Sequence, residues 1–263
     1  MSKYVLVPDS FKGTMTSREI CEIMQHAIER IDSDAKIISV PVADGGEGSV
    51  DAFLSALGGK RKAIIVTGPH FEKLSSSYGI TDDGTAVIEM SACAGLPLVY
   101  GKKNPELTTT YGVGELICNA ARSGARRIVI GLGGSATNDG GCGAAAAAGI
   151  KFYDKSGKSF IPVGRTLKDI ASIDYSGLDS ALSGVSISAM CDVDNPLLGE
   201  TGAANVFGPQ KGANVAMIAR LDAGLKHLAE VSGKAKLSSM PSAGAAGGMG
   251  FGMMAFFNCP LQM

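Results

Sequence analysis

The fold of this chain is decided by the stretch Gly131-Leu132-Gly133-Gly134-Ser135-Ala136-Thr137-Asn138-Asp139-Gly140-Gly141. It follows an apolar run over residues 127–130 that predicts a buried strand, and it precedes an alanine-rich run over residues 142–149 that predicts a helix. A glycine-rich turn between strand and helix lets backbone N–H groups approach an anion, and the helix N-terminus adds partial positive charge. The stretch therefore predicts an α/β fold with a phosphate-binding loop.

Length and composition narrow the class of protein. The chain has 263 residues, of which 45% are hydrophobic and 19% charged, which is typical of a globular protein with one large or two ordinary domains. A net charge of -1 and the absence of Trp argue against nucleic acid and against acidic membranes as partners. The N-terminus lacks a signal-peptide pattern, and six cysteines without C-x-x-C spacing indicate reduced thiols. We therefore expect a cytoplasmic protein.

The order of elements predicts two units. A strand over residues 3–8, a helix that starts at the capping box Thr16–Glu19, a strand over 36–42 and a helix that ends near residue 58 are typical of a parallel sheet. Three short β-type runs then follow between residues 61 and 90, with a hairpin signal at 82–84. We expect residues 1–60 to begin a parallel-sheet domain, and residues 61–263 to form a second α/β domain that has a mixed sheet and contains the glycine loop.

Further elements are expected in the second half of the chain. A helix over about residues 112–123, strands over 151–154 and 185–191, and a long amphipathic helix capped by Asn214 are predicted.

Two aspartates follow the strand over residues 185–191. Alternation along an extended segment places Asp192 and Asp194 on the same side, where they could share a Mg²⁺ ion or divide the roles of base and metal ligand. The alternative is an Asx turn before Pro196, which Asp and Asn also favour.

Two glycine-flanked turns carry lysines, Lys12 and Lys211. Either ammonium could neutralise a phosphate or a substrate carboxylate, although a solvated surface lysine is the commoner case. Asp44 and Glu47 follow the second strand, at the sheet edge where open α/β sheets bind ligands, and helix capping is their alternative role.

A dinucleotide-binding loop is a second interpretation of the glycine stretch. Gly131-x-Gly133-x-x-Ala136 follows a strand, and Asp154 lies near the end of the next one. Two features count against an NAD(P)-dependent oxidoreductase: Asp139 would repel a pyrophosphate, and Gly140–Gly141 delay the helix. The Walker A pattern is absent from the chain.

Seven segments together resemble the bacterial type I glycerate kinase family. They lie at residues 9–13, 44–48, 108–115, 131–141, 192–199, 206–213 and 244–248. Each is short, but their joint order is specific, and the resemblance extends from the first strand to about residue 257.

The resemblance implies a discontinuous flavodoxin-like domain and an inserted second α/β domain, with the site in the cleft between them. It implies ATP- and Mg²⁺-dependent phosphorylation of D-glycerate to 2-phosphoglycerate or 3-phosphoglycerate. On this basis we expect ATP at Gly133, Gly134, Ser135, Asn138 and Asp139; Mg²⁺ at Asp192 and Asp194; and further catalytic roles for Lys12, Lys211 and Asp44. A homodimer is the expected oligomer.

The chain departs from the family at its C-terminal end. The resemblance implies further βα units and a Gly-Glu-Gly segment beyond residue 263. We therefore expect an incomplete first domain and weakened activity. A remnant that binds ligand without catalysis stays open as an alternative.

Overall fold

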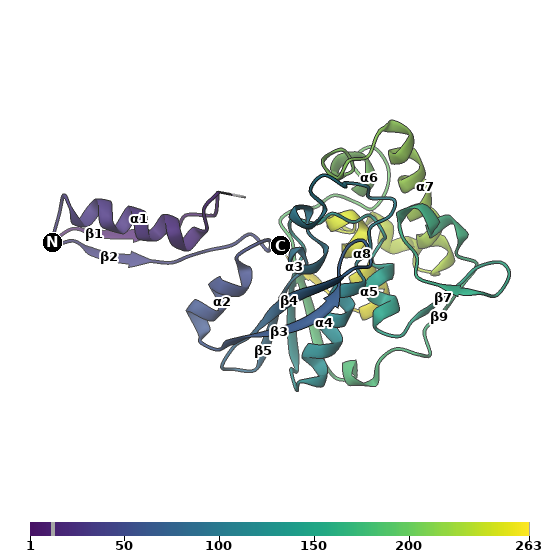
Figure 1. The fold of residues 1–263 in the computed structure, drawn as a ribbon, viewed down its shortest axis with the longest axis horizontal. Helices are drawn as coiled ribbons and strands as arrows, with labels where there is room; N and C mark the ends of the chain where they lie inside the picture. The colour runs from purple at the N-terminus through teal and green to yellow at the C-terminus, as the bar shows by residue number, and fades with distance from the viewer. Residues whose placement is uncertain (12–13, 263) are drawn as a thin grey trace.

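A βαβ unit forms an arm at the N-terminal end of the chain. The structure, a computed structural model, describes residues 1–11 and 14–262. Strands β1 (Lys3–Leu6) and β2 (Lys36–Ser39) pair in parallel, and helix α1 (Ser17–Glu29) connects them. The arm extends from one end of the larger body (Figure 1). The predicted parallel pairing of these two strands is confirmed.

Local hydrogen bonds fix the start of α1. The Glu19 N–H donates to the Thr16 hydroxyl (3.2 Å), and the Thr16 N–H donates to the Glu19 carboxylate (2.7 Å). The arm buries Leu6, Ile20 and Cys21 as its own small apolar core. Many of its other apolar side chains are exposed, namely Tyr4, Val5, Val7, Ile23, Met24, Ile31, Ile38 and Val40.

The body contains a six-stranded mixed sheet in the order β11-β10-β6-β5-β4-β3. These strands are β3 (Lys60–Thr67), β4 (Lys73–Ile80), β5 (Thr85–Glu89), β6 (Arg127–Gly131), β10 (Ser186–Met190) and β11 (Leu261–Gln262). The β3–β4 and β4–β5 pairs are antiparallel, whereas β5, β6, β10 and β11 run parallel. The α/β class with a mixed sheet in the second unit and the hairpin at residues 82–84 are both confirmed.

Helices surround this sheet and build a second core beside it. Their bounds are α2 (Ser49–Leu57), α3 (Ser91–Ala94), α4 (Tyr111–Arg122), α5 (Cys142–Ala147), α6 (Ala203–Phe207), α7 (Val215–Val231) and α8 (Ala245–Phe257). The described residues also form five 3-10 turns: η1 (Leu96–Val99), η2 (Gly164–Asp169), η3 (Ser180–Leu182), η4 (Pro209–Lys211) and η5 (Ala235–Ser239). Helix α2 packs on β4 and β5, so it lies with the body rather than with the arm.

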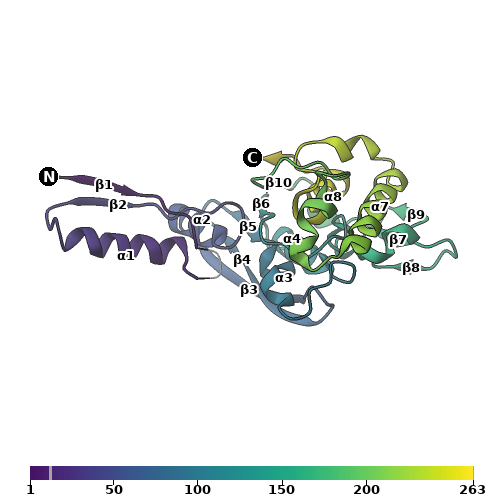
Figure 2. The same ribbon diagram turned by 90° about the horizontal axis from the view of Figure 1, so that it is seen from above.

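A small antiparallel sheet lies at the end of the body away from the arm (Figure 2). It consists of β7 (Lys151–Tyr153), β8 (Ser159–Phe160) and β9 (Ser172–Asp174), with β7 in the middle. Phe152 of β7 packs edge-on against Phe256 of α8, with ring centroids 5.8 Å apart. This contact joins the small sheet to the second core.

The register of the parallel strands places three loops side by side. Glu89 at the end of β5 pairs with Gly131 at the end of β6, which in turn pairs with Met190 at the end of β10. Every residue of β5 is buried, as expected for a strand in the middle of a sheet that is covered on both faces. The loops after β5, β6 and β10 therefore meet at one edge.

Candidate functional site

The loops at this edge surround a small hollow of about 110 Å³. The glycine loop after β6 supplies one wall, residues 191–193 after β10 supply another, and Lys211 and Ala246 close it. Open α/β sheets bind ligands at this kind of edge. The hollow brings together five of the residues expected from the sequence: Gly133, Gly134, Ser135, Asp192 and Lys211.

The glycine loop is covered by the segment over residues 44–48. The Gly133 N–H donates to the Gly45 carbonyl (3.1 Å), and a Cβ at residue 133 would lie 2.6 Å from the Gly46 Cα. Only glycine allows this approach. The expected phosphate contact from the Gly133 amide is not available in this arrangement, because the chain already satisfies that donor.

The N-terminus of α5 holds an internal anion, Asp139. Its carboxylate accepts hydrogen bonds from the N–H groups of Thr110 (2.7 Å), Gly141 (3.1 Å) and Gly143 (3.2 Å), and from the Thr110 hydroxyl (2.9 Å). Burial raises the pKa of Asp139, and these hydrogen bonds oppose that shift. In this structure a carboxylate of the chain itself therefore occupies the helix end at which a nucleotide phosphate was expected, and the contact of Asp139 with ATP stays a prediction.

Threonines at residues 108–110 support the loop from beneath. The Thr108 hydroxyl donates to the Ala136 carbonyl (2.9 Å), and the Thr110 hydroxyl accepts from the Ala144 N–H (2.9 Å). No role in the site was expected for these threonines from the sequence. The signal that could have found them is the Thr108–Thr110 run within one of the seven resembling segments.

Lys211 is a buried lysine, not a solvated one. Only 1% of its surface is exposed, and its Nζ donates to the Ser135 hydroxyl (2.8 Å) and to the Thr137 carbonyl (2.7 Å). Burial lowers the pKa of Lys211 to about 7, and the negative charge of Asp139 counteracts part of this effect. The ammonium therefore fixes the glycine loop from inside.

The two residues after Ala136 carry unpaired buried groups. The Thr137 hydroxyl and both polar atoms of the Asn138 side chain have no hydrogen-bond partner within the part of the chain that the structure describes. Both residues are fully buried. Asn138 was expected to contact ATP, but it is buried and does not line the small hollow.

The two aspartates after β10 differ in their placement. Both are exposed, but Asp192 lines the small hollow and Asp194 does not. Among residues 1–11 and 14–262, no three His, Cys, Asp or Glu side chains are grouped to hold a metal ion. One or two carboxylates nevertheless fit Mg²⁺, which keeps several waters and takes its other ligands from substrate phosphates.

A larger hollow of about 620 Å³ adjoins the small one. Gly133, Gly134 and Gln210 line both hollows, and Asp44 and Glu47 line only the larger of these two. The Asp44 carboxylate accepts a hydrogen bond from the Gly46 N–H (3.0 Å), which shapes the 44–48 turn.

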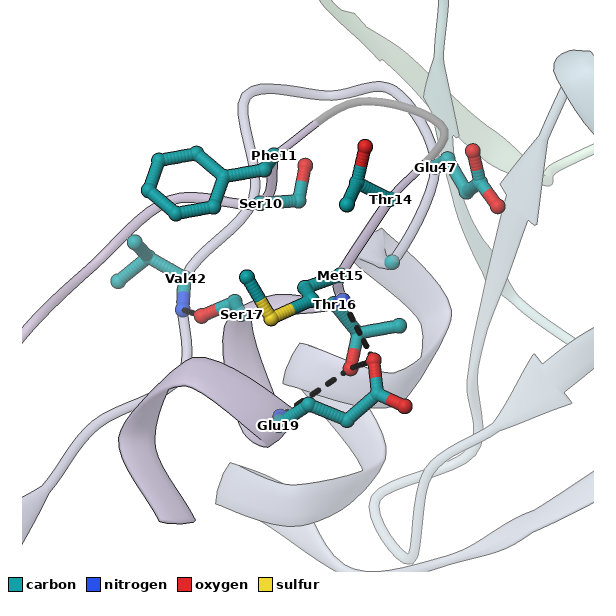
Figure 3. Close-up of a pocket in the computed structure, with 10 residues that line it drawn as sticks. Ser10, Phe11, Thr14, Met15, Thr16, Ser17, Glu19, Val42 and Glu47 are labelled. Carbon is teal, nitrogen blue, oxygen red and sulfur yellow. Dashed lines mark hydrogen bonds between the residues drawn. The ribbon is translucent and has the colours of Figure 1, made fainter. Parts of the chain in front are cut away.

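A third hollow, of about 290 Å³, lies where the arm meets the 44–48 segment. Figure 3 shows Ser10 and Phe11 above the start of α1, with Thr14 and Glu47 to one side. Glu47 lines this hollow and the larger one, so the two are neighbours. The expected catalytic residue Lys12 lies outside the described residues.

The geometry does not support the dinucleotide-binding interpretation. Strand β7 pairs with β8 and β9 in a separate antiparallel sheet, so it does not continue a parallel βαβ unit from β6. Asp154 is hydrogen-bonded within its own turn, to Ser156 and to the Lys158 N–H. Its carboxylate is therefore not placed beside the glycine loop.

The cysteines and the lengths of the helices bear on the environment of the protein. All six cysteines are buried free thiols. Every helix in the described ranges is too short or too polar to traverse a lipid bilayer.

Comparisons with known proteins agree with one another. The model of the glycerate kinase family matches residues 4–263. The chain is 48% identical to glycerate 2-kinase of Escherichia coli strain K12 and 45% identical to glycerate kinase of Bacillus subtilis strain 168, covering 99% of this chain and 70% and 69% of those proteins. It is similar to the crystal structure of a Salmonella typhimurium LT2 protein designated glycerate kinase 2, with a TM-score of 0.88 and 41% identity over 99% of this chain and 71% of that one.

Proposed function

The chain belongs to the glycerate kinase family, and we propose that it transfers the γ-phosphoryl group of ATP to a hydroxyl of D-glycerate, giving 2-phosphoglycerate. The observation that carries this proposal is the meeting of the glycine loop, Asp192 and Lys211 around one small hollow. The name of the Escherichia coli relative favours the 2-phosphate over the 3-phosphate.

The acceptor hydroxyl is assigned to the small hollow. Phosphoryl transfer depends mainly on positioning and on neutralising charge. Asp192 is the only carboxylate that lines the small hollow, among the described residues, and there it can accept the proton of the attacking hydroxyl. Gly134 and Ser135 line the same hollow, next to the path by which the transferred phosphoryl group must arrive.

Lys211 supplies the positive side of the site. Its Nζ donates hydrogen bonds to the Ser135 hydroxyl and to the Thr137 carbonyl, which fix the position of the ammonium beneath the glycine loop. From this fixed position its positive charge can stabilise the transferred phosphoryl group. A pKa of about 7 leaves Lys211 partly ionised near neutral pH. Mg²⁺, when bound, would neutralise phosphate charge, and Asp192 with Asp194 are the carboxylates proposed to hold it.

The proposal also covers the domain organisation, the cellular location and the oligomeric state. Residues 1–60 are proposed to begin a flavodoxin-like domain and residues 61–263 to form the second domain, and the packing of α2 on β4 and β5 favours a boundary that lies before α2. The six free thiols support a reducing, cytoplasmic location. We propose a homodimer as the oligomer, and a measurement of the molecular mass of the protein in solution tests it.

An ADP-release assay with D-glycerate tests the proposed function. We expect turnover that requires ATP, D-glycerate and Mg²⁺ together, and phosphorus NMR of the product to identify the 2-phosphate. Calorimetric binding of D-glycerate and ADP without any turnover would instead favour the non-catalytic remnant. Glycerate-independent ATP hydrolysis alone would contradict the assignment of the acceptor.

A further inference from the structure

We propose that the hollow of about 620 Å³ beside the end of β5 is the site for the nucleoside of ATP, with Ala92 and the 3-10 turn Leu96–Leu98 as its apolar wall. This inference deepens the proposed kinase function and rests on it. None of these wall residues was expected from the sequence to take part in the site.

Size separates the three hollows. Sites for ligands as large as a nucleotide occupy about 300–1,000 Å³. The hollow beside β5 lies within this range, whereas the volumes of about 110 Å³ at Asp192 and about 290 Å³ at Ser10 do not reach it. A three-carbon acid or one phosphoryl group suits the smallest hollow, and a purine with its ribose suits the largest.

The chemistry of the walls sets the orientation of the nucleotide. Ala92, Leu96 and Leu98 offer an apolar surface against which a planar base can lie, and Leu98 is 37% exposed. Asp44 and Glu47 line the same hollow. Their carboxylates repel a triphosphate but accept hydrogen bonds from an amino group or from ribose hydroxyls. The nucleoside, which carries no charge, is therefore placed in this hollow, and the triphosphate is placed outside it.

The small hollow at Asp192 and the larger hollow beside β5 share part of their lining, and a triphosphate that reaches from one to the other must pass over it. Gly133, Gly134 and Gln210 line both, and Lys211 follows Gln210 on the side of the small hollow. The apolar wall is tied to the same loop, because the Leu96 N–H donates to the Gly134 carbonyl (2.9 Å). A nucleoside beside β5 thus directs its phosphates over Gly133–Gly134 toward Lys211 and Asp192.

Two substitutions test the site by opposite means. Ala92→Leu fills the hollow, and Leu98→Ser removes apolar surface from its wall. Leu178→Ser is the matched control, since Leu178 is 39% exposed and lies outside this hollow. Isothermal titration with ADP, and separately with D-glycerate, is done on the 263-residue chain and on each variant, with the Tm recorded by circular dichroism.

We expect Ala92→Leu to weaken ADP binding by at least about tenfold and Leu98→Ser to weaken it by about threefold or more, with the Kd for D-glycerate unchanged. Leu178→Ser should alter neither constant. Should Ala92→Leu fail to fold, the surface variant Leu98→Ser still decides the question. ADP binding that is unaffected by Leu98→Ser overturns the site assignment alone. An unmodified chain that binds neither ADP nor D-glycerate overturns the proposed function as well.

Discussion

Replacing Lys211 by methionine should change how the stability of this protein depends on pH. The side chain keeps its length but loses the ammonium, which is almost fully buried against Ser135 and Thr137. Burial lowers the pKa of Lys211 from 10.5 to about 7. At about 1.4 kcal/mol per unit of pKa, this difference corresponds to roughly 5 kcal/mol of unfavourable free energy when the group is charged.

The direction of the pH effect follows from proton binding. Between about pH 7 and about pH 10.5 the unfolded chain binds a proton at Lys211 that the folded chain lacks, so the free energy of unfolding rises with pH in this window. The limiting slope is about 1.4 kcal/mol per pH unit. Below about pH 7 both states are protonated and the full penalty is present. The Lys211→Met variant lacks this contribution at every pH.

The measurement is the difference in unfolding free energy between the unmodified chain and Lys211→Met, obtained from urea unfolding followed by circular dichroism. Burial raises the pKa values of Cys93, Cys118 and Cys259, which lowers stability at alkaline pH in both proteins. Subtraction removes that contribution. The buried acceptors left unpaired by the substitution add a penalty of about 1–3 kcal/mol each that does not vary with pH.

From about pH 7 to about pH 9.5 the difference should rise by up to about 3 kcal/mol in favour of the unmodified chain. Lys155→Met, at an exposed lysine, is the control for which the difference should stay level. A level difference for Lys211→Met too would refute the account of a desolvated ammonium beneath the loop.

Three further substitutions test the site. Asp192→Asn should lower kcat by about 10²-fold or more if the carboxylate acts on the proton or the metal. Asp169→Asn is the control, because Asp169 lines neither of the two hollows at the sheet edge, and it should leave kcat unchanged. A change of less than about tenfold in Asp192→Asn removes that residue from the mechanism. Gly133→Ala places a Cβ 2.6 Å from the Gly46 Cα, so kcat/KM for ATP should fall as the two loops separate, and unchanged kinetics would contradict this contact. Asp139→Asn replaces an acceptor of four hydrogen bonds by an amide, and thermal unfolding should show a loss of about 2–4 kcal/mol; an unchanged Tm would mean that the carboxylate does not hold the loop.

Local elements of the fold follow from short stretches of sequence. The helix start at Thr16 and the helix cap at Asn214 depend on side chains three residues from their partners, so the sequence suffices to predict them. The hairpin between β4 and β5 and the strand before the glycine loop depend on equally local patterns. Helix α8 is different, because its glycine content predicts no helix. It forms where Gly252 packs closely on the backbone of Gly140 and Gly141.

The sequence alone also selected five of the twelve described residues around the small hollow, since Gly133, Gly134, Ser135, Asp192 and Lys211 all lie in recognisable turns. It could not assign their partners. Asp139 meets Thr110 across 29 residues, and Lys211 meets Ser135 across 76.

Residue types and their local spacing therefore determined the order of strands and helices, the glycine turn and the candidate polar groups. Only the tertiary structure decided that the anion at the N-terminus of α5 is Asp139 and that the ammonium of Lys211 lies inside the protein. The physical reason is that desolvation and long-range hydrogen bonds depend on which segments pack together. That packing is a property of the whole folded chain, so a window of neighbouring residues does not contain it.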